Sequence, residues 1–318
     1  MARAVRPAAG RDSVLNIAHR GARNVAPENT LEAMEKAAQL GADAVEIDVQ
    51  LTADGCVVVV HDDDLMRCTD APRRFPHRMP WRVSDFDAAD IRLLDAGGWF
   101  VDELDKPPPE RQSWLRSLTD DERNAFIRPE DLAHYASGSV KVPLLSECLQ
   151  SCKRLGLAVH IELKAIPRFY PGLAEKVIER LRESDMQDAV TVSSFDHRQV
   201  ARVSKLAPGV RTAVLSSDRL YHPAEYLARL GASAYNPGCH GDCDTVGFGA
   251  VTGQLDHETI SEVRAAGYDV YVWTENDPER MGRLIDAGVS GIFTDYPNRL
   301  RALLDLRGGK SVSGSFRD

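Results

Sequence analysis

Apolar runs and segments of helical periodicity alternate along most of this chain. The first apolar run, 14–18, precedes apolar residues at helical spacing from Leu31 to Leu40. Asn29 or Thr30 is the predicted N-cap of this helix, and Gly41 its C-terminal stop. Repetition of such strand–helix units predicts an α/β fold with a parallel sheet.

Strand and helix patterns resume after residue 142 and continue to residue 306. We predict helices over 145–155, 172–184, 197–206, 223–230, 256–266, 278–287 and 297–306, and strands over 157–164, 189–194, 210–215, 232–236, 268–273 and 291–294. Polar residues stand at the ends of many of these strands, which is typical of a (β/α)8 TIM barrel. A doubly wound sheet would instead concentrate its site at one switch point.

The stretch 45–62 contains two apolar runs separated by Asp54-Gly55, a turn that predicts a β-hairpin. Glu46 and Asp48 are two residues apart, so on a strand they point to the same face. Two such carboxylates are costly unless a divalent metal or a nearby Lys or Arg neutralises them.

The second run of this hairpin raises a geometric question. The chain has nine apolar strand runs, so one run lies outside a regular barrel, or the barrel is irregular here. A plain antiparallel return would also carry His61 away from the carboxylates. Either the second run joins the barrel in parallel, or Glu46 and Asp48 lie lower in it.

Residues 62–142 break the regular pattern and are rich in Pro, Arg and Asp, with helical pieces near 84–94 and 129–136. A structureless loop of this length is improbable, so we predict an insertion subdomain with aromatic residues as its core. These aromatics are Trp81, Phe86, Trp99, Phe100 and Trp114. The predicted organisation is one barrel over 14–306, this insertion within it, and flexible ends at 1–13 and 307–318.

Charge and hydropathy narrow the class of protein. The chain has 318 residues and a net charge of −9, which argues against broad binding to nucleic acid or anionic membranes. It contains no apolar run long enough to span a membrane and no secretory h-region near the N-terminus. We therefore expect a soluble, cytoplasmic protein with a small-molecule partner, and a homo-oligomer is left open.

The six cysteines do not form the pattern of a disulfide framework. Cys148 and Cys152 are one helical turn apart, as expected of a buried helix face. Cys239 and Cys243 flank a His in a Gly-rich loop, for which zinc binding or a disulfide is the alternative to plain loop cysteines. The absence of a second pair favours the plain interpretation.

Candidate chemistry gathers at the predicted strand ends. Glu46, Asp48 and Glu162 form an oxygen-rich set suited to Mg²⁺ or Ca²⁺. Arg20 and Lys164 supply positive charge for a phosphate. His19 and His61 titrate near neutral pH, as an acid and a base require. Each residue has a bland explanation alone, but together they indicate phosphodiester cleavage.

The motifs that carry these residues resemble the glycerophosphodiester phosphodiesterase family. The resemblance covers about residues 14–300 with the motif order intact. The matching motifs include His19-Arg20-Gly21, Ala26-Pro27-Glu28-Asn29-Thr30, Glu46-Ile47-Asp48, His61-Asp62-x-x-Leu65-x-Arg67, Ile161-Glu162-Leu163-Lys164, Ser193-Ser194-Phe195-Asp196, Trp273-Thr274-x-Asn276 and Thr294-Asp295.

The resemblance implies a (β/α)8 barrel with a small insertion after the strand ending at His61, and hydrolysis of a glycerophosphodiester to sn-glycerol 3-phosphate and an alcohol. The implied roles are an acid/base pair (His19, His61), metal ligands (Glu46, Asp48, Glu162), phosphate binders (Arg20, Lys164), organisers of the first loop (Glu28, Asn29) and pocket-lining aromatics (Phe195, Trp273). The segments 106–139 and 239–249 depart from the family pattern and put the alcohol specificity in doubt.

Two rival functions remain open from the sequence. One is a lysophospholipase D or sphingomyelinase D-like phosphodiesterase acting on lipids, which the Glu162/Lys164 and Trp273/Asn276 motifs favour less. The other is a non-catalytic barrel that binds a ligand, which loss of a histidine or a carboxylate would have favoured. All of those residues are present.

Overall fold

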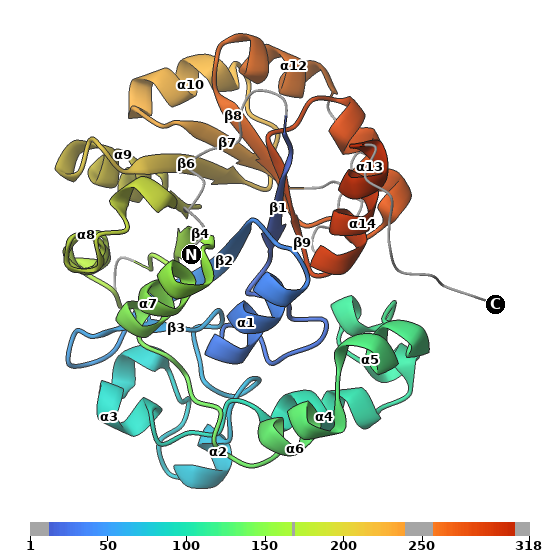
Figure 1. Cartoon of the computed structure of the whole chain (residues 1–318). Coiled ribbons are helices and arrows are strands. Elements are labelled where there is room, and N and C mark those ends of the chain that lie inside the picture. Colours follow the sequence, from blue (N-terminus) through green and yellow to red (C-terminus); the bar gives the residue numbers. More distant parts are fainter. Residues whose placement is uncertain (1–12, 167–168, 239–256, 309–318) are drawn as a thin grey trace.

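A computed structural model describes residues 13–166, 169–238 and 257–308 of the chain. Its strands form one sheet in the order β1-β9-β8-β7-β6-β5-β4-β2-β3, and β1 also pairs with β2. Every pairing except β2–β3 is parallel, so the strands other than β3 close into a barrel (Figure 1). The predicted (β/α)8 barrel is confirmed. Its strands are β1 (Leu15–Ala18), β2 (Ala44–Leu51), β4 (Ala158–Leu163), β5 (Val190–Ser194), β6 (Arg211–Ser216), β7 (Ala234–Pro237), β8 (Asp269–Val272) and β9 (Gly291–Thr294).

Helices surround this barrel, each with an apolar face on the strands (Figure 1). Thr30 is the N-cap of α1, since its Oγ1 accepts a hydrogen bond from the Ala33 amide at 3.2 Å. Gly41 follows the helix with a φ of +77°, as predicted for its stop. The surrounding helices are α1 (Leu31–Gln39), α7 (Leu145–Leu155), α8 (Leu173–Ser184), α9 (His197–Leu206), α10 (Pro223–Leu230), α12 (His257–Ala265), α13 (Pro278–Asp286) and α14 (Pro297–Arg307).

The ninth strand answers the geometric question left by the sequence. β3 (Val57–Val59) lies outside the barrel and pairs antiparallel with the far end of β2, Val59 opposite Val49. The Val60 amide then donates to the Asp48 carbonyl at 2.9 Å, which brings the chain back to the level of that residue. Glu46 and Asp48 thus lie lower in the barrel than the end of β2, so the antiparallel return delivers His61 beside them.

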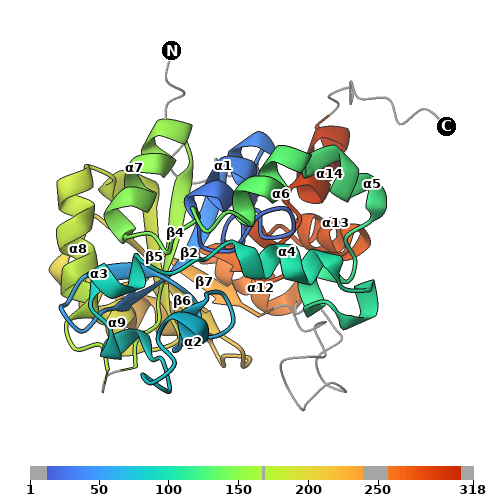
Figure 2. The same cartoon turned by 90° about the horizontal axis from the view of Figure 1, so that it is seen from below.

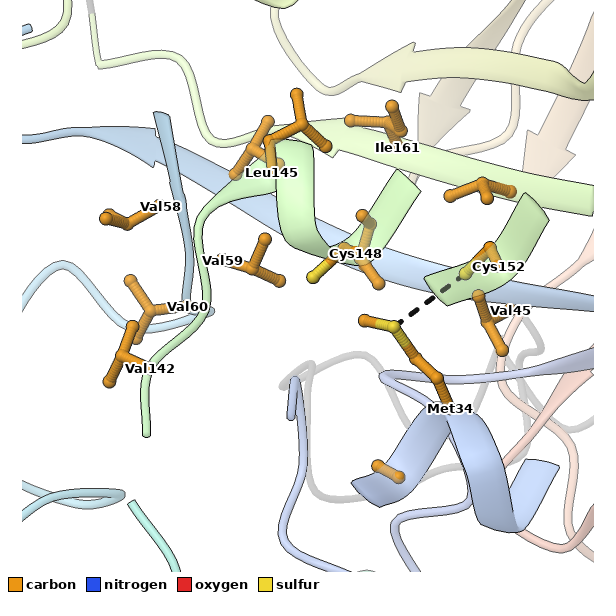
Figure 3. Close-up of a cluster of buried hydrophobic side chains, with 14 of the residues drawn as sticks. Met34, Val45, Val58, Val59, Val60, Val142, Leu145, Cys148, Cys152 and Ile161 are labelled. Carbon is orange, nitrogen blue, oxygen red and sulfur yellow. Dashed lines mark hydrogen bonds between the residues drawn. The ribbon is translucent and has the colours of Figure 1, made fainter. Parts of the chain in front are cut away.

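Apolar packing fixes the place of this return. Figure 3 shows Val59 of β3 facing Cys148 of α7, with Met34 of α1 nearby, while Val58 and Val60 lie on the other side of the strand. Cys148 and Cys152 are buried and free, which confirms the predicted buried helix face, and the Cys152 thiol lies 3.7 Å from the Met34 sulfur. Burial of each large apolar side chain contributes about 1.5–3 kcal/mol, so β3 is held firmly against α7.

Residues 62–142 form short helices that lie beside the barrel, against α1 and α14 (Figures 1 and 2). The Lys36 ammonium of α1 contacts Asp131 at 2.6 Å, and Arg299 of α14 contacts Glu122 at 2.6 Å. The buried aromatics of this segment belong to the same apolar cluster as β2. Its helices are α2 (Ala71–Arg74), α3 (Ala88–Ile91), α4 (Gly98–Asp105), α5 (Asp120–Phe126) and α6 (Pro129–Tyr135), with 3-10 turns at Val83–Asp85, Pro108–Glu110 and Ser113–Leu115. Its status as a subdomain stays a prediction.

Some expectations fall outside the described residues. The loop with Cys239 and Cys243 lies wholly in the gap at 239–256. The predicted flexible ends lie mainly before residue 13 and after residue 308, and α14 ends at Arg307. Among the described helices, none has the length and apolar character needed to cross a membrane.

Candidate active site

A cavity of about 400 Å³ opens at the carboxyl ends of the barrel strands. Its wall contains most of the residues predicted from the sequence, together with several that were not predicted. The lining residues are His19, Arg20, Arg23, Glu46, His61, Asp62, Arg67, Gln112, Ser113, Trp114, Glu162, Lys164, Ser193, Phe195, Leu215, Trp273, Thr274 and Phe293. The remaining predicted residues, Glu28, Asn29 and Asp48, are buried directly behind this wall.

The turn after β1 aims Arg20 at the carboxylates. Arg20 and Gly21 both have positive φ, 57° and 79°, and a Cβ on Gly21 would lie 2.6 Å from the Ala33 Cβ. Only glycine fits that close approach. In this turn the Arg20 amide donates to Glu46 Oε2 at 2.9 Å, and its guanidinium donates to Glu28 at 3.0 Å.

Asn29 joins this turn to β2. Its backbone amide donates to the Arg20 carbonyl at 2.9 Å, and its side-chain amide donates to Asp48 Oδ2 at 2.8 Å. Asn29 has a φ of 56°, a conformation that Asn tolerates better than most side chains. These are the contacts expected of a residue that organises the first loop.

Three carboxylates meet at the cavity floor. Glu46, Asp48 and Glu162 each place an oxygen within 4.8 Å of the others. The Lys164 ammonium lies 2.7 Å from Glu162 and 3.2 Å from Asp48 Oδ1, but Glu46 Oε1 receives no hydrogen bond from the described residues. A buried anionic oxygen without a donor is costly, so this cluster fits a cation.

The pKa values of two of these carboxyl groups diverge. Burial raises the pKa of Glu46 well above its ordinary range, and the charges of Asp48 and Glu162 raise it further. Burial also acts upward on the pKa of Asp48, but the charges of Lys164, His61 and Arg20 hold it below its usual value. A divalent cation at this cluster would favour the ionised form of Glu46.

Each histidine of the cavity is oriented by a carboxylate. His19 Nδ1 lies 2.8 Å from Asp295 Oδ1, and His61 Nδ1 lies 2.6 Å from Asp62 Oδ1. A carboxylate only accepts, so Nδ1 carries the proton in both rings and Nε2 is left for a substrate. Burial lowers the pKa of His19 to about 4, with the positive charge of Arg23 as the next contribution.

An aromatic pair forms part of the opposite wall. The Phe195 and Trp273 rings meet edge to face, with centroids 5.4 Å apart and an interplanar angle of 89°. The Trp273 indole N–H donates to the Asn236 carbonyl at 2.8 Å, which fixes the ring. Phe195 is 45% exposed at the cavity mouth and is free to meet an apolar group.

Several residues of this site were missed from the sequence. Asp62 and Asp295 stand inside the recognised motifs, which was the available signal, and Asp62 also directly follows His61. Nothing in the sequence pattern around Arg23 indicated a place in the site. Trp114 was predicted to serve the core of the insertion; it is partly buried against the apolar cluster and also lines the cavity, as do its neighbours Gln112 and Ser113. Nothing in the local pattern indicates that contact, because the segment reaches the site only after the insertion docks.

Comparisons with known proteins agree with this geometry. Residues 19–299 match the model of the "Glycerophosphoryl diester phosphodiesterase family". A glycerophosphodiester phosphodiesterase of Bacillus altitudinis is 32% identical over 89% of this chain and 94% of its own length. An uncharacterized protein of Bacillus subtilis, YqiK, is 33% identical over 90% of this chain and 97% of its own.

A solved structure shows the same likeness. The phosphodiesterase of Oleispira antarctica, in complex with the product sn-glycerol-3-phosphate, matches with a TM-score of 0.70 and 26% identity. The match covers 91% of this chain and 96% of that one. The resemblance and the enzyme class predicted from the motifs are confirmed, and the chain belongs to the glycerophosphoryl diester phosphodiesterase family.

Proposed function

We propose that this chain hydrolyses glycerophosphodiesters to sn-glycerol 3-phosphate and an alcohol, with one divalent cation and His19 and His61 as the acid/base pair. One observation carries the proposal: two carboxylate-oriented histidines, two cations and a three-carboxylate cluster share a single cavity. No simpler structural role needs all of these groups at one place.

The charges of the site support a divalent cation. Six carboxylates are gathered here, those of Glu28, Glu46, Asp48, Asp62, Glu162 and Asp295, against four cations, Arg20, Arg23, Arg67 and Lys164. The balance is two negative charges when all are ionised, which one divalent ion would neutralise. Glu46, Asp48 and Glu162 would hold it, and it would stabilise negative charge on the phosphoryl oxygens. Oxygen ligands suit Mg²⁺ and Ca²⁺ alike.

The side chains of the chain itself account for the remaining steps. Lys164 and Arg20 place positive charge at the cavity for the phosphate, Lys164 as a point charge. One histidine, in its neutral Nδ1–H form, accepts a proton from the attacking oxygen at Nε2. The other, in its doubly protonated form, donates the proton on its Nε2 to the leaving oxygen. Phe195 and Trp273 would contact the carbon skeleton of the substrate.

A lipid substrate is the second candidate. Phe195 is 45% exposed beside Trp273, so an acyl chain could lie against this pair. The lysophospholipase D reaction would need the same phosphate chemistry and differ only in that contact.

Product analysis tests both candidates. The purified chain, with and without Mg²⁺ or Ca²⁺, is incubated with glycerophosphocholine, glycerophosphoethanolamine and lysophosphatidylcholine. We expect metal-dependent release of sn-glycerol 3-phosphate from the first two. Choline release from lysophosphatidylcholine alone would support the lipid enzyme, and the absence of any product would support a binding protein. The cytoplasmic location and the oligomeric state stay predictions.

A further inference from the structure

Behind each histidine stands a carboxylate, and behind each carboxylate an arginine. The His19 triad consists of His19, Asp295 and Arg23, because the Arg23 Nε atom donates to the same Asp295 oxygen that accepts from His19. The Asn276 side chain donates to the other Asp295 oxygen at 2.7 Å. Asp295 therefore has a donor on each oxygen.

The His61 triad repeats this arrangement on the other side. Arg67 donates to both oxygens of Asp62, from Nε at 2.6 Å and from Nη2 at 3.0 Å. Such bidentate pairing fixes the plane of the carboxylate, and hence the orientation of the imidazole bound to it. The two triads have the same chemistry although their histidines come from different strands.

The two triads meet at one carboxylate. Glu28 is 4% exposed, and Arg67 donates to its two oxygens at 2.7 and 3.1 Å. The Arg23 guanidinium lies 3.5 Å from Glu28 Oε2. Burial acts upward on the pKa of Glu28, but Arg20 and Arg67 hold it well below its ordinary range. Glu28 is therefore a permanent anion between the two arginines.

The arginines of the two triads also contact one aromatic ring. The guanidinium carbon of Arg23 lies 4.0 Å from the Trp114 ring centroid, and that of Arg67 lies 5.6 Å from it. Both distances fall within the range of cation–π attraction. Trp114 comes from the 106–139 segment, and the Tyr296 hydroxyl donates to its carbonyl at 2.5 Å. The insertion thus reaches the residue next to Asp295.

We propose that Glu28 and Trp114 are positioning residues that hold both acid/base histidines in one geometry, by fixing the arginines of the His19 and His61 triads. The proposal rests on the proposed function for its catalytic meaning, but its geometry stands by itself. It assigns the insertion a role in the reaction: docking of Trp114 completes the support of both rings. Neither residue touches the reacting atoms.

Three variants test this role by kinetics. Glu28→Gln and Trp114→Leu should each lower kcat by about tenfold to a hundredfold, the usual cost of losing such a supporting contact. Glu28→Gln keeps an oxygen that can still accept from the Arg20 guanidinium, so its KM should stay near the wild-type value. Trp114→Phe keeps a ring under both arginines and should recover most of the lost kcat. A fall in thermal stability with kcat within twofold of wild type would overturn the proposal.

Leaving-group dependence separates the two triads. A diester with an aryl leaving group needs no proton on departure, so the variant that damages the general-acid side is rescued by it. Asp62→Asn and Asp295→Asn should therefore differ in their aryl-to-alkyl rate ratios. Because Glu28 contacts the arginines of both triads, Glu28→Gln should show an aryl-to-alkyl rate ratio between those of the two aspartate variants. A Glu28→Gln ratio identical to wild type would contradict the shared support.

A measurement without turnover keeps the two proposals separate. At an alkaline pH, where both rings are neutral, nitrogen NMR of the ¹⁵N-histidine-labelled full chain should show the Nδ1–H tautomer for both His19 and His61 in the wild type. Glu28→Gln and Trp114→Leu should shift the signals of both rings. Asp269→Asn removes a charge from another arginine-paired carboxylate, at the opposite end of the barrel, and should shift neither.

The outcomes are distinguishable. A change in one ring only, or in neither, would overturn the common support by Glu28 and Trp114 whatever the activity. If the wild type hydrolysed no diester but both rings changed in the variants, the proposed function would fail and the positioning role would stand.

Discussion

The two ends of the barrel both hold clusters of carboxylates paired with arginines, but only one end holds a large cavity. At the amino end, Asp269 pairs with Arg211 and Arg264 beside a cavity of about 20 Å³. At the carboxyl end, six carboxylates and four arginine or lysine side chains surround a cavity of about 400 Å³. Charge alone therefore does not mark the functional end; the state of its hydrogen bonds does.

The two ends differ in how many hydrogen bonds their carboxylate oxygens accept. Asp269 Oδ1 accepts from Arg264 and Ser290, each at 2.8 Å, and its other oxygen accepts from Arg211 and from the Tyr271 hydroxyl. Each oxygen of Asp269 thus accepts two hydrogen bonds, so this carboxylate is fully paired by the described residues. Glu46 at the other end keeps an oxygen without a donor among the described residues. A buried carboxylate oxygen without a donor is a place for a cation.

Two buried histidines repeat the contrast. Burial lowers the pKa of His160 to about 3 and that of His19 to about 4. His160 lies edge to face between the rings of Tyr271 and Phe293, and its Nδ1 receives no partner among the described residues. His19 is held by Asp295. His160 therefore fills the barrel interior, whereas His19 is oriented by a carboxylate toward the cavity.

Metal removal should give the largest effect. Exhaustive chelation is expected to bring diester hydrolysis to background, because Glu46, Asp48 and Glu162 would lose the charge they surround. Added Mg²⁺ or Ca²⁺ should restore it, as measured by release of sn-glycerol 3-phosphate. Asp269→Asn enzyme provides the control, since its ion pair lies far from the cluster and its response to chelation should match wild type. Activity that persists after chelation would contradict the metal site.

Removal of either histidine should give the second-largest effect on activity. His19→Ala and His61→Ala are each expected to lower turnover by about 10²–10⁴-fold, the range for loss of a general acid or base. Thermal unfolding should show that both variants remain folded. A rate near wild type in either one would remove that histidine from the mechanism.

Breaking the amino-end network should affect stability instead. Asp269→Asn is expected to lower the free energy of unfolding by about 1–3 kcal/mol, less than for a fully buried pair, because its partners are partly exposed. Urea denaturation measures the loss, and kcat should stay at the wild-type value. A clear fall in kcat would mean that the two ends are coupled.

The smallest expected effect is the contribution of His160 to the pH dependence of stability. The folded-state pKa of His160, about 3, lies below the ordinary value of 6.5. Its contribution to the free energy of unfolding is therefore fully present above pH 6.5. The contribution is lost as the pH falls from 6.5 toward 3, at up to about 1.4 kcal/mol per pH unit. Urea denaturation between pH 7.5 and 5 should show a shallower pH slope for His160→Gln. His19 acts in the same direction, so part of the slope should remain; an unchanged slope would contradict the assignment.

The sequence by itself determined the elements of the barrel and indicated the chemistry, but it did not predict helices α2, α4 and α5 of the insertion. The period of apolar residues depends only on local backbone geometry, so the helices 145–155 and 223–230 and the strand 291–294 match the structure residue for residue. The histidines and cations stand at strand ends and the carboxylates on the strands themselves, and a barrel brings all of them to one end. Their residue types were therefore enough to indicate a phosphodiester and a metal.

Only the tertiary structure decided what supports them. His19 and Asp295 are 276 residues apart, and Tyr296 and Trp114 are 182 apart. Such pairs form because the barrel closes β1 on β9 and the insertion docks beside α14, and no local pattern encodes either event. The path of β3 is of the same kind: Asp54-Gly55 predicts a hairpin, but packing of β3 against α7 places His61 beside Asp48.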